Sequence, residues 1–327
     1  MPISQFERRV VLLVTLAVAL WVSLCAIQPH MPTNPASRFA AMQALVEHHT
    51  WAIDDTSLGA STVDKVRVGG HSYSSKPPVL NLIGAGCYFV IRAVTGWTFD
   101  TKLYALGNLF GLLLGVLPWA AAMLLFHRLL ARFVVSEKVR ITVAIAMITG
   151  SLATSYASSF QNHTLGFGAV IWAWWLWSAA LLGEKPELSQ RDLTLGAFLG
   201  GLAITFELTS AALIGAPLAA LLWYTRKHWS LNRWIVPALA LAAPVTLHFY
   251  LGWVATGEII PVQFKEAAWH YAGSYWSNPV EFDALKEPWA VYSFHTLLGH
   301  HGLFSHTPWL LLALPWVFAF PREKVER

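Results

Sequence analysis

Long apolar blocks separated by short basic stretches dominate the pattern along this chain. Eight blocks have, or approach, the length that a helix needs to cross a bilayer. A helix satisfies its own backbone hydrogen bonds in lipid, so the pattern predicts an all-α, polytopic transmembrane helical bundle forming one domain over residues 1–327. The eight predicted spans are residues 10–27, 103–127, 141–157, 165–183, 193–206, 209–225, 234–252 and 306–320.

A ninth apolar stretch, residues 79–95, is predicted to lie along the membrane interface or dip into it. The reason is charge, because lysine and arginine near span ends collect on the cytoplasmic side. With eight spans, most of the 22 Lys and Arg fall in cytoplasmic connectors at 1–9, 128–140, 184–192, 226–233 and 321–327. The outer side of an inner (plasma) membrane then receives a first loop of 28–102, a short loop of 158–164 and a long loop of 253–305.

Composition supports a membrane protein and excludes several function classes. Hydrophobic residues make up 56% of the chain and charged residues only 12%, whereas soluble domains carry about 25% charged residues. The net charge of +4 comes from residues between apolar blocks, which topology explains without a nucleic-acid partner. Cys25 and Cys87 form no spaced motif, so no disulfide framework or cysteine metal site is expected.

The most informative polar segment is residues 62–78, which includes Gly-His-Ser-Tyr-Ser-Ser-Lys-Pro-Pro. Lys76, held at the membrane surface by two prolines, is predicted to pair with a lipid phosphate. Arg38 is predicted to add a bidentate contact. For both residues the alternative is that the charged head simply extends to the interface from an apolar stem.

The first outer loop is also predicted to contain a short amphipathic helix. Ser37 is expected to cap a helix from Arg38 to His49, whose apolar stripe lies flat on lipid or on the spans. Gly59, Gly69 and Gly70 predict turns around residues 62–68.

These two features together resemble a known family. The pattern S-R-F-x-x-M-x-x-L, followed by G-H-x-Y-S-x-K-P-P, is similar to the first outer loop of GT-C superfamily glycosyltransferases that use lipid carriers. More narrowly, the pattern is similar to bacterial relatives of the protein O-mannosyltransferases and of the enzyme that adds aminoarabinose to lipid A. The resemblance implies a GT-C-like bundle, an outward-facing site and a polyprenyl-phosphate-sugar donor. The donor phosphate would bind Lys76 and Arg38, with Tyr73 of the same motif beside them.

The family also carries an acidic pair just before that arginine, where this chain has Pro35 and Ala36. An acceptor hydroxyl needs a nearby base to attack the sugar. The substitutes in the same loop are Asp64, Asp55 and Asp54, in that order of preference. The last two also suit the end of a helix or a turn.

Four further residues are predicted to face the acceptor. His163 is expected to steer the acceptor or share its proton, and Asn162 and His71 to bind it, although a polar helix end explains residues 162–163 as well. Glu207 lies between two apolar stretches, and a carboxylate deep in lipid is costly, so we expect it at a turn on the outer surface.

The predicted function is therefore a membrane glycosyltransferase that transfers a sugar to a glycan, lipid or protein acceptor. A lipid or solute transporter or flippase, and a non-catalytic protein that binds the lipid carrier, are the alternatives. No cofactor is expected. A divalent metal would require the histidines before the last span, which lack the i, i+4 spacing of a strong metal motif. These are His295, His300, His301 and His306.

Overall fold

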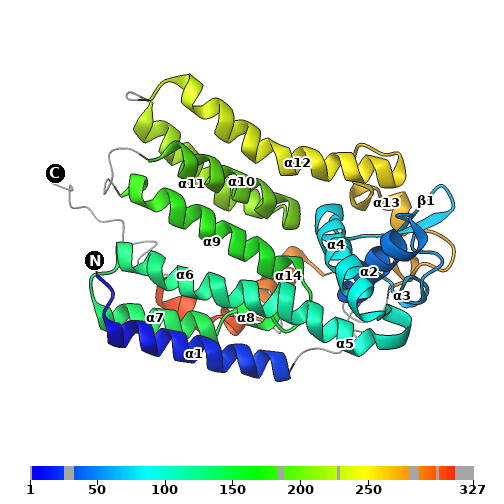
Figure 1. Ribbon diagram of the computed structural model, residues 1–327, viewed down its shortest axis with the longest axis horizontal. Helices are drawn as coiled ribbons and strands as arrows, with labels where there is room; N and C mark the ends of the chain where they lie inside the picture. The colour runs from blue at the N-terminus through cyan, green and yellow to red at the C-terminus, as the bar shows by residue number, and fades with distance from the viewer. Residues whose placement is uncertain are drawn as a thin grey trace.

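The computed structural model describes residues 2–25, 33–182, 188–226, 229–279, 287–299 and 302–313. Long helices lie side by side in a bundle, with smaller elements gathered at one end (Figure 1). The long helices are α1 (Gln5–Leu24), α5 (Phe99–Gly111), α6 (Leu117–Phe133), α7 (Glu137–Thr149), α9 (Asn162–Leu181), α10 (Gln190–Phe206), α11 (Ser210–Thr225) and α12 (Ile235–Thr256). A π-helical turn, Leu112–Val116, joins α5 to α6.

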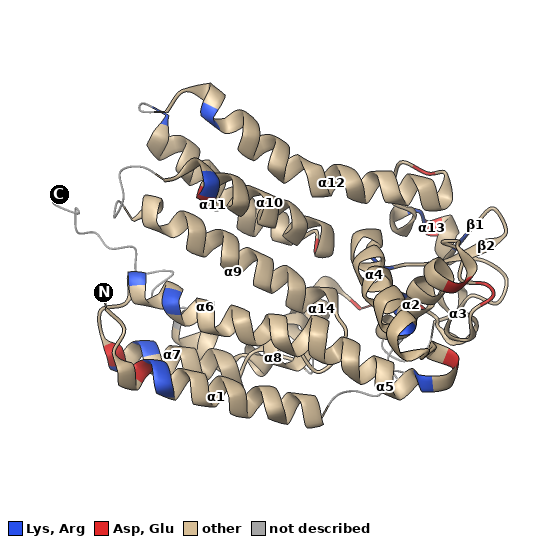
Figure 2. Cartoon of the chain, in the orientation of Figure 1, with Lys and Arg blue, Asp and Glu red and all other residues tan. Residues whose placement is uncertain are grey.

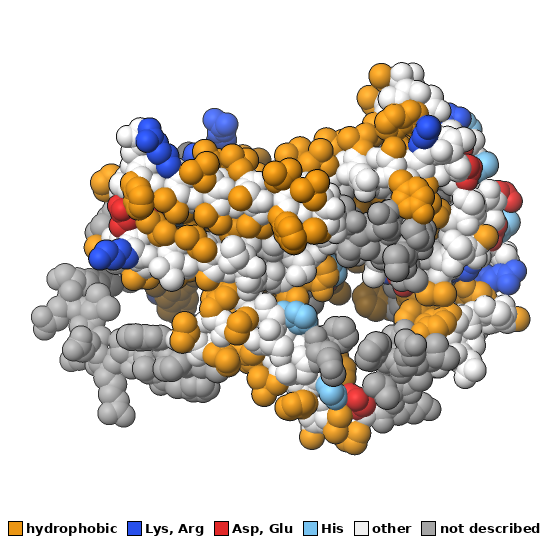
Figure 3. Space-filling view, turned by 90° about the horizontal axis from the view of Figure 1, so that it is seen from below, with side chains coloured by type: hydrophobic (Ala, Val, Ile, Leu, Met, Phe, Trp, Pro, Cys, Tyr) orange, Lys and Arg blue, Asp and Glu red, His pale blue; other side chains and the backbone are white. Residues whose placement is uncertain are grey.

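Four helical segments among the described residues are long and apolar enough to cross a membrane. They are Pro78–Thr95, Phe99–Phe133, Asn162–Leu181 and Leu231–Thr256. Charged side chains gather at the two ends of the bundle and leave the middle of its long helices uncharged (Figure 2). Hydrophobic side chains spread over the surface between those ends (Figure 3). These features are those of a helical membrane protein.

Three of the predicted spans, 103–127, 165–183 and 234–252, correspond to three of these segments. The prediction of one continuous helix over 141–157 is wrong, because α7 ends at Thr149 and Ser151 adopts an extended backbone before the short α8 (Leu152–Tyr156). Helices α10 and α11 have only 17 and 16 residues, and α1 carries three charges in its first turns.

The last predicted span, 306–320, is not a long helix in its described part. Residues 303–313 form α15 (Leu303–His306) and a 3₁₀ turn (Pro308–Ala313), preceded by α14 (Trp289–Leu297). Residues 314–320 lie outside the described residues.

Residues 79–95 form the single helix α4 (Pro78–Thr95), which begins at Pro78 because proline suits the first helical position. Its length and composition match those of a membrane span. It packs on α2 (Thr33–Gln43) and also contacts α12 (Figure 1). The interfacial placement of this stretch remains a prediction.

The end of the bundle that carries α2, α4 and residues 44–77 and 257–277 is called the loop end below. It contains α3 (Ser57–Ser61) and an antiparallel hairpin of β1 (Lys65–Val68) and β2 (His71–Ser74), so the chain is not purely α-helical. Gly69 and Gly70 form the hairpin turn at φ values of +58° and +89°, which glycine adopts without strain. The 3₁₀ turn Val262–Phe264 and α13 (Glu266–Trp269) complete this end, with a 3₁₀ turn at Tyr275–Ser277.

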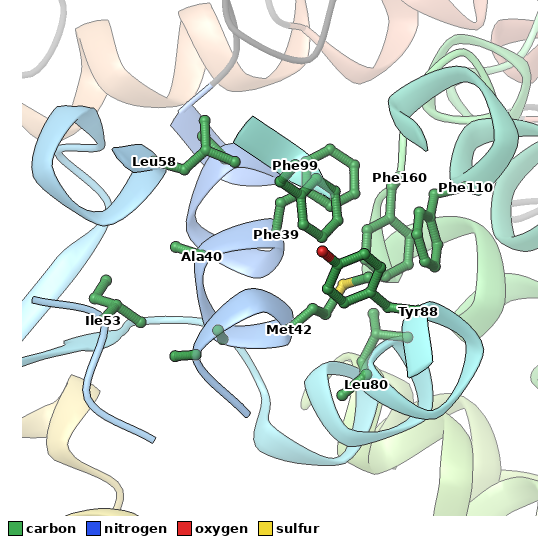
Figure 4. Packing of buried hydrophobic residues seen from close by; sticks show 14 of the residues in the cluster. Phe39, Ala40, Met42, Ile53, Leu58, Leu80, Tyr88, Phe99, Phe110 and Phe160 are labelled. Carbon is green, nitrogen blue, oxygen red and sulfur yellow. The ribbon is translucent and has the colours of Figure 1, made fainter. Parts of the chain in front are cut away.

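The helix predicted from Arg38 to His49 instead starts five residues earlier, at Thr33, and is α2, followed by a π-helical turn Ala44–His48. Ser37 is therefore not its cap, and its hydroxyl donates to the carbonyl of Asp64 at 2.6 Å. The apolar stripe of α2 is buried inside the loop end. Phe39 lies 4.9 Å from the Phe99 ring and 5.8 Å from the Phe160 ring (Figure 4).

A buried ion cluster lies at the opposite end. Glu7 of α1 binds Arg140 of α7 at 2.6 Å and His127 of α6 at 2.7 Å. A buried charge persists only when it is paired and hydrogen-bonded, and here the three groups satisfy each other. The cluster ties α1 to the two helices beside it.

Helices α10 and α12 approach closely at Gly201, and this contact supports the site described below. A Cβ atom at Gly201 would lie 2.3 Å from the Leu241 carbonyl oxygen, so the two backbones must separate. We expect Gly201→Ala to destabilise the protein by about 1–3 kcal/mol and lower its melting midpoint in detergent. Gly215→Ala on α11 is the control, because its Cβ meets nothing within 4 Å. Equal midpoints for the two variants would contradict this packing.

Candidate functional site

Lys76 lies at the loop end, just after the hairpin, and its ammonium contacts Asp64. The Nζ to Oδ2 distance is 3.1 Å, and the two side chains are only 15% and 10% exposed. The backbone holds the pair in place, since the Asp64 carbonyl accepts hydrogen bonds from the Ser37 and Ser75 hydroxyls. Sequence analysis selected both residues separately, and the structure brings them together.

Burial lowers the pKa of Lys76, Asp64 raises it, and the nearby positive charge of Arg38 lowers it further. The net direction is downward, which means that the ammonium lacks part of the solvation it has in water. An anion arriving beside Lys76 therefore gains a strong partner.

Arg38 of α2 is 1% exposed. Its two terminal nitrogens bind protein groups, whereas its buried Nε has no hydrogen-bond partner among the described residues. It donates to the Asn34 carbonyl at 3.1 Å and to the side chains of Asn162 and Gln161. Burial lowers its pKa to about 10, while the charges of Asp64 and Glu207 raise it, so Arg38 stays protonated at neutral pH. Arg38 is therefore placed to hold neighbouring protein groups in position.

Asn162, which accepts a hydrogen bond from Arg38, also binds Glu207. Its amide donates to the Glu207 carboxylate at 2.8 Å and to the Phe206 carbonyl at 2.9 Å. His163 Nδ1 lies 2.7 Å from the same carboxylate. The hydrogen bond from His163 lowers the pKa of Glu207, burial raises it, and the charges of His163 and Arg38 lower it, with a net downward shift. Glu207 is therefore an ionised carboxylate, placed at the junction of α9, α10 and α2.

Two cavities lie between these groups. The larger, about 260 Å³, has a polar wall that includes Asn162 and Glu207 and an apolar wall from α10 and α12. The smaller, about 40 Å³, is lined by Lys76 and Tyr73 among others.

The boundary between the two cavities is formed by side chains that line both of them. His248 and Phe249 of α12, with Pro261 and Gln263, line both cavities. On the opposite wall the residues that join β2 to α4 alternate between the cavities: Ser75 and Pro77 line the larger one, whereas Ser74, Lys76 and Pro78 line the smaller one. The two cavities are thus neighbouring halves of one cleft.

The other predicted residues lie elsewhere at the loop end. Asp54 accepts a hydrogen bond from the Ser72 amide at 3.0 Å and pairs with His71 at 3.0 Å. Burial raises the pKa of Asp54, but the hydrogen bonds from Ser72 and His71 outweigh it, and the net shift is downward. Asp55 is exposed beside it. None of these three lines either cavity, so Asp54 and His71 fasten the hairpin.

Sequence analysis missed Gln161 and, more importantly, His248. A signal for His248 was present, because an ionisable residue inside the apolar run 234–252 is unusual and marks a functional site by default. Among the residues that the structure describes, no three His, Cys, Asp or Glu side chains form a cluster that would hold a metal ion. His300 and His301 lie outside those residues, and His295 contacts Glu287 at 3.8 Å.

The cleft combines an ammonium in one half, an ionised carboxylate in the other, the imidazole of His248 where the halves meet, and an apolar wall reaching along two helices of the bundle. These groups suit an amphipathic anion, with proton transfer at the carboxylate. No protein-family model, curated protein or solved structure matches this chain.

Proposed function

We propose that this protein is a membrane glycosyltransferase that moves a sugar from a polyprenyl-phosphate donor to an acceptor hydroxyl. The observation that carries the proposal is the divided cleft, in which Lys76 lies in one half and Glu207 in the other. A donor of this class has an anionic phosphate, a sugar and an apolar tail, and the cleft offers a partner for each. The resemblance of the first loop to GT-C glycosyltransferases supports the same reaction.

In this proposal the donor phosphate binds Lys76 in the smaller cavity, and the polyprenyl chain follows the apolar wall of α10 and α12. The acceptor oxygen attacks the anomeric carbon, and the bond from that carbon to the phosphate oxygen breaks. The phosphate leaves with the bonding electrons, and Lys76 stabilises its growing charge. The acceptor proton goes to a carboxylate.

Glu207 is the better candidate for that carboxylate, although the sequence favoured Asp64. Glu207 lines the larger cavity and is ionised, whereas Asp64 lines neither cavity and is paired with Lys76. We assign Asp64 to positioning Lys76. Arg38 acts through Asn162, which holds the Glu207 carboxylate in place.

The orientation of the site follows from charge. The basic ends of α1, α6, α10 and α12 lie at the end of the bundle opposite the loop end (Figure 2). Positive charge marks the cytoplasmic side, so the proposed site faces outward from the inner membrane.

The test uses the full chain in proteoliposomes with a panel of undecaprenyl-phosphate sugars, each labelled in the sugar. We expect at least one of them to release free lipid phosphate and to label an acceptor in added membrane extract. Movement of an intact sugar lipid across the bilayer without phosphate release would contradict the proposal and favour a transporter. Binding without any turnover would favour a non-catalytic lipid-binding protein.

A further inference from the structure

His248 lies within the apolar helix α12, eight residues before that helix ends at Thr256. It belongs to the segment Leu231–Thr256, which is long and apolar enough to cross a membrane. Neighbouring side chains in this helix are apolar, and a polar imidazole placed there costs free energy unless it finds a partner. The residue therefore needs an explanation that packing alone does not give.

The imidazole is only partly satisfied. Its Nδ1 atom is buried, and no hydrogen-bond partner for it exists among the described residues. Its ring lies edge-on to that of Phe249, with centroids 5.7 Å apart, a contact that uses neither nitrogen. A buried polar atom without a partner is rare in folded proteins and calls for a specific explanation, such as a catalytic role or a bound water or ion.

The position of His248 in the cleft limits which group of a ligand can be the hydrogen-bond partner of its Nδ1 atom. His248 lines both the Lys76 cavity and the Glu207 cavity, and so lies where the two halves meet. In the proposed reaction the phosphate is held on one side of this boundary and the base lies on the other. The sugar of the donor, which joins the phosphate to the attacking oxygen, must occupy the boundary itself.

We infer that His248 binds a hydroxyl group of the donor sugar and is the residue that distinguishes a glycosylated lipid phosphate from the bare one. This inference rests on the proposed function, because it takes a lipid-linked sugar as the ligand. The apolar wall and Lys76 contact both lipids, and the bare monoester carries more negative charge than the phosphodiester of the glycosylated lipid. The imidazole, by contrast, gains a sugar hydroxyl as partner only in the glycosylated lipid.

The experiment measures binding, with no turnover needed. The full chain in nanodiscs is titrated with undecaprenyl phosphate and with the same lipid carrying a hexose or a pentose. We expect the wild type to bind the bare lipid and at least one glycosylated form. His248→Phe should weaken that binding about tenfold, the worth of one hydrogen bond, and leave the bare lipid unchanged. His248→Gln, which keeps a hydrogen-bonding side chain, should recover part of the loss.

Three controls distinguish a specific loss of sugar binding from misfolding and from a general loss of lipid binding. Unchanged binding of the bare lipid by His248→Phe shows that the variant is folded, and Lys76→Met should weaken both lipids. His270→Phe, a histidine that lines neither cavity, should bind both lipids as the wild type does.

The inference is overturned if His248→Phe weakens both lipids equally, if it weakens neither, or if no glycosylated form binds the wild type. Failure of the wild type to bind either lipid would instead overturn the proposed function itself.

Discussion

Lys76→Met is expected to lower the rate of sugar transfer by about 10²–10³-fold, the usual effect of removing one group that stabilises a developing negative charge. Methionine keeps most of the volume of lysine, so the small cavity should retain its shape. The loss should be large because Lys76 is mostly buried and faces the space assigned to the phosphate. The measurement is the initial rate of lipid-phosphate release from the labelled donor.

Lys65→Met is the matched control. Lys65 comes from the same loop, but its ammonium donates to the carbonyls of Gly59 and Ala60 and it lines neither cavity. Its transfer rate should stay within about twofold of wild type, as for a surface substitution away from the site. A similar loss in both variants would show that general loop damage, and not the phosphate contact, explains the effect.

Glu207→Gln is expected to lower the transfer rate by about 10²–10⁴-fold, the range for loss of a general base. Glutamine still accepts hydrogen bonds from Asn162 and His163 but takes no proton. Asp64→Asn should cost less, about tenfold, since it weakens one charge-assisted contact that positions Lys76 without removing the base. Glu258→Gln, which alters an exposed pair with Lys265 at the same end, should have the wild-type rate.

Whether Glu207→Gln or Asp64→Asn lowers the transfer rate more decides which carboxylate is the base. If Asp64→Asn has the larger effect, the base is in the first loop, as the sequence favoured, and our assignment of Glu207 is wrong.

A pH profile gives an independent measurement of the same role. His163 lowers the pKa of Glu207, and activity that depends on the ionised carboxylate is lost as pH falls through that pKa. His163→Phe removes the lowering group, so the pKa of Glu207 rises and the acidic limb of the profile should move to higher pH. An acidic limb that does not move would remove Glu207 from the role of base.

Features that depend on neighbours in the chain were predictable. Apolar runs of about 20 residues gave three of the spans, because the free energy of burying a helix in lipid depends mainly on its own composition. Gly69 and Gly70 gave the turn, because the positive φ values there are a backbone preference of glycine itself.

Features that depend on weak local preferences were predicted less well. The break at residues 150–151 lies in an apolar run without a proline, and the short β-hairpin has no long alternating pattern. Ser37 has the chemistry of a helix cap, but tertiary contact with Asp64 takes its hydroxyl instead. Local propensity is a weak prior, and packing overrides it.

By itself, therefore, the sequence determined that this chain is a helical membrane protein and that Lys76 is a candidate to bind an anion. Only the tertiary structure decided which groups meet. Arg38, Asn162 and Glu207 come from α2, α9 and the end of α10, and the contact of Asn162 with Arg38 spans 124 residues of sequence. The partition by His248 likewise needs α12 to lie against the segment 74–78. Such contacts depend on how whole helices pack, and no pattern within one helix encodes the side chains that another helix will present to it.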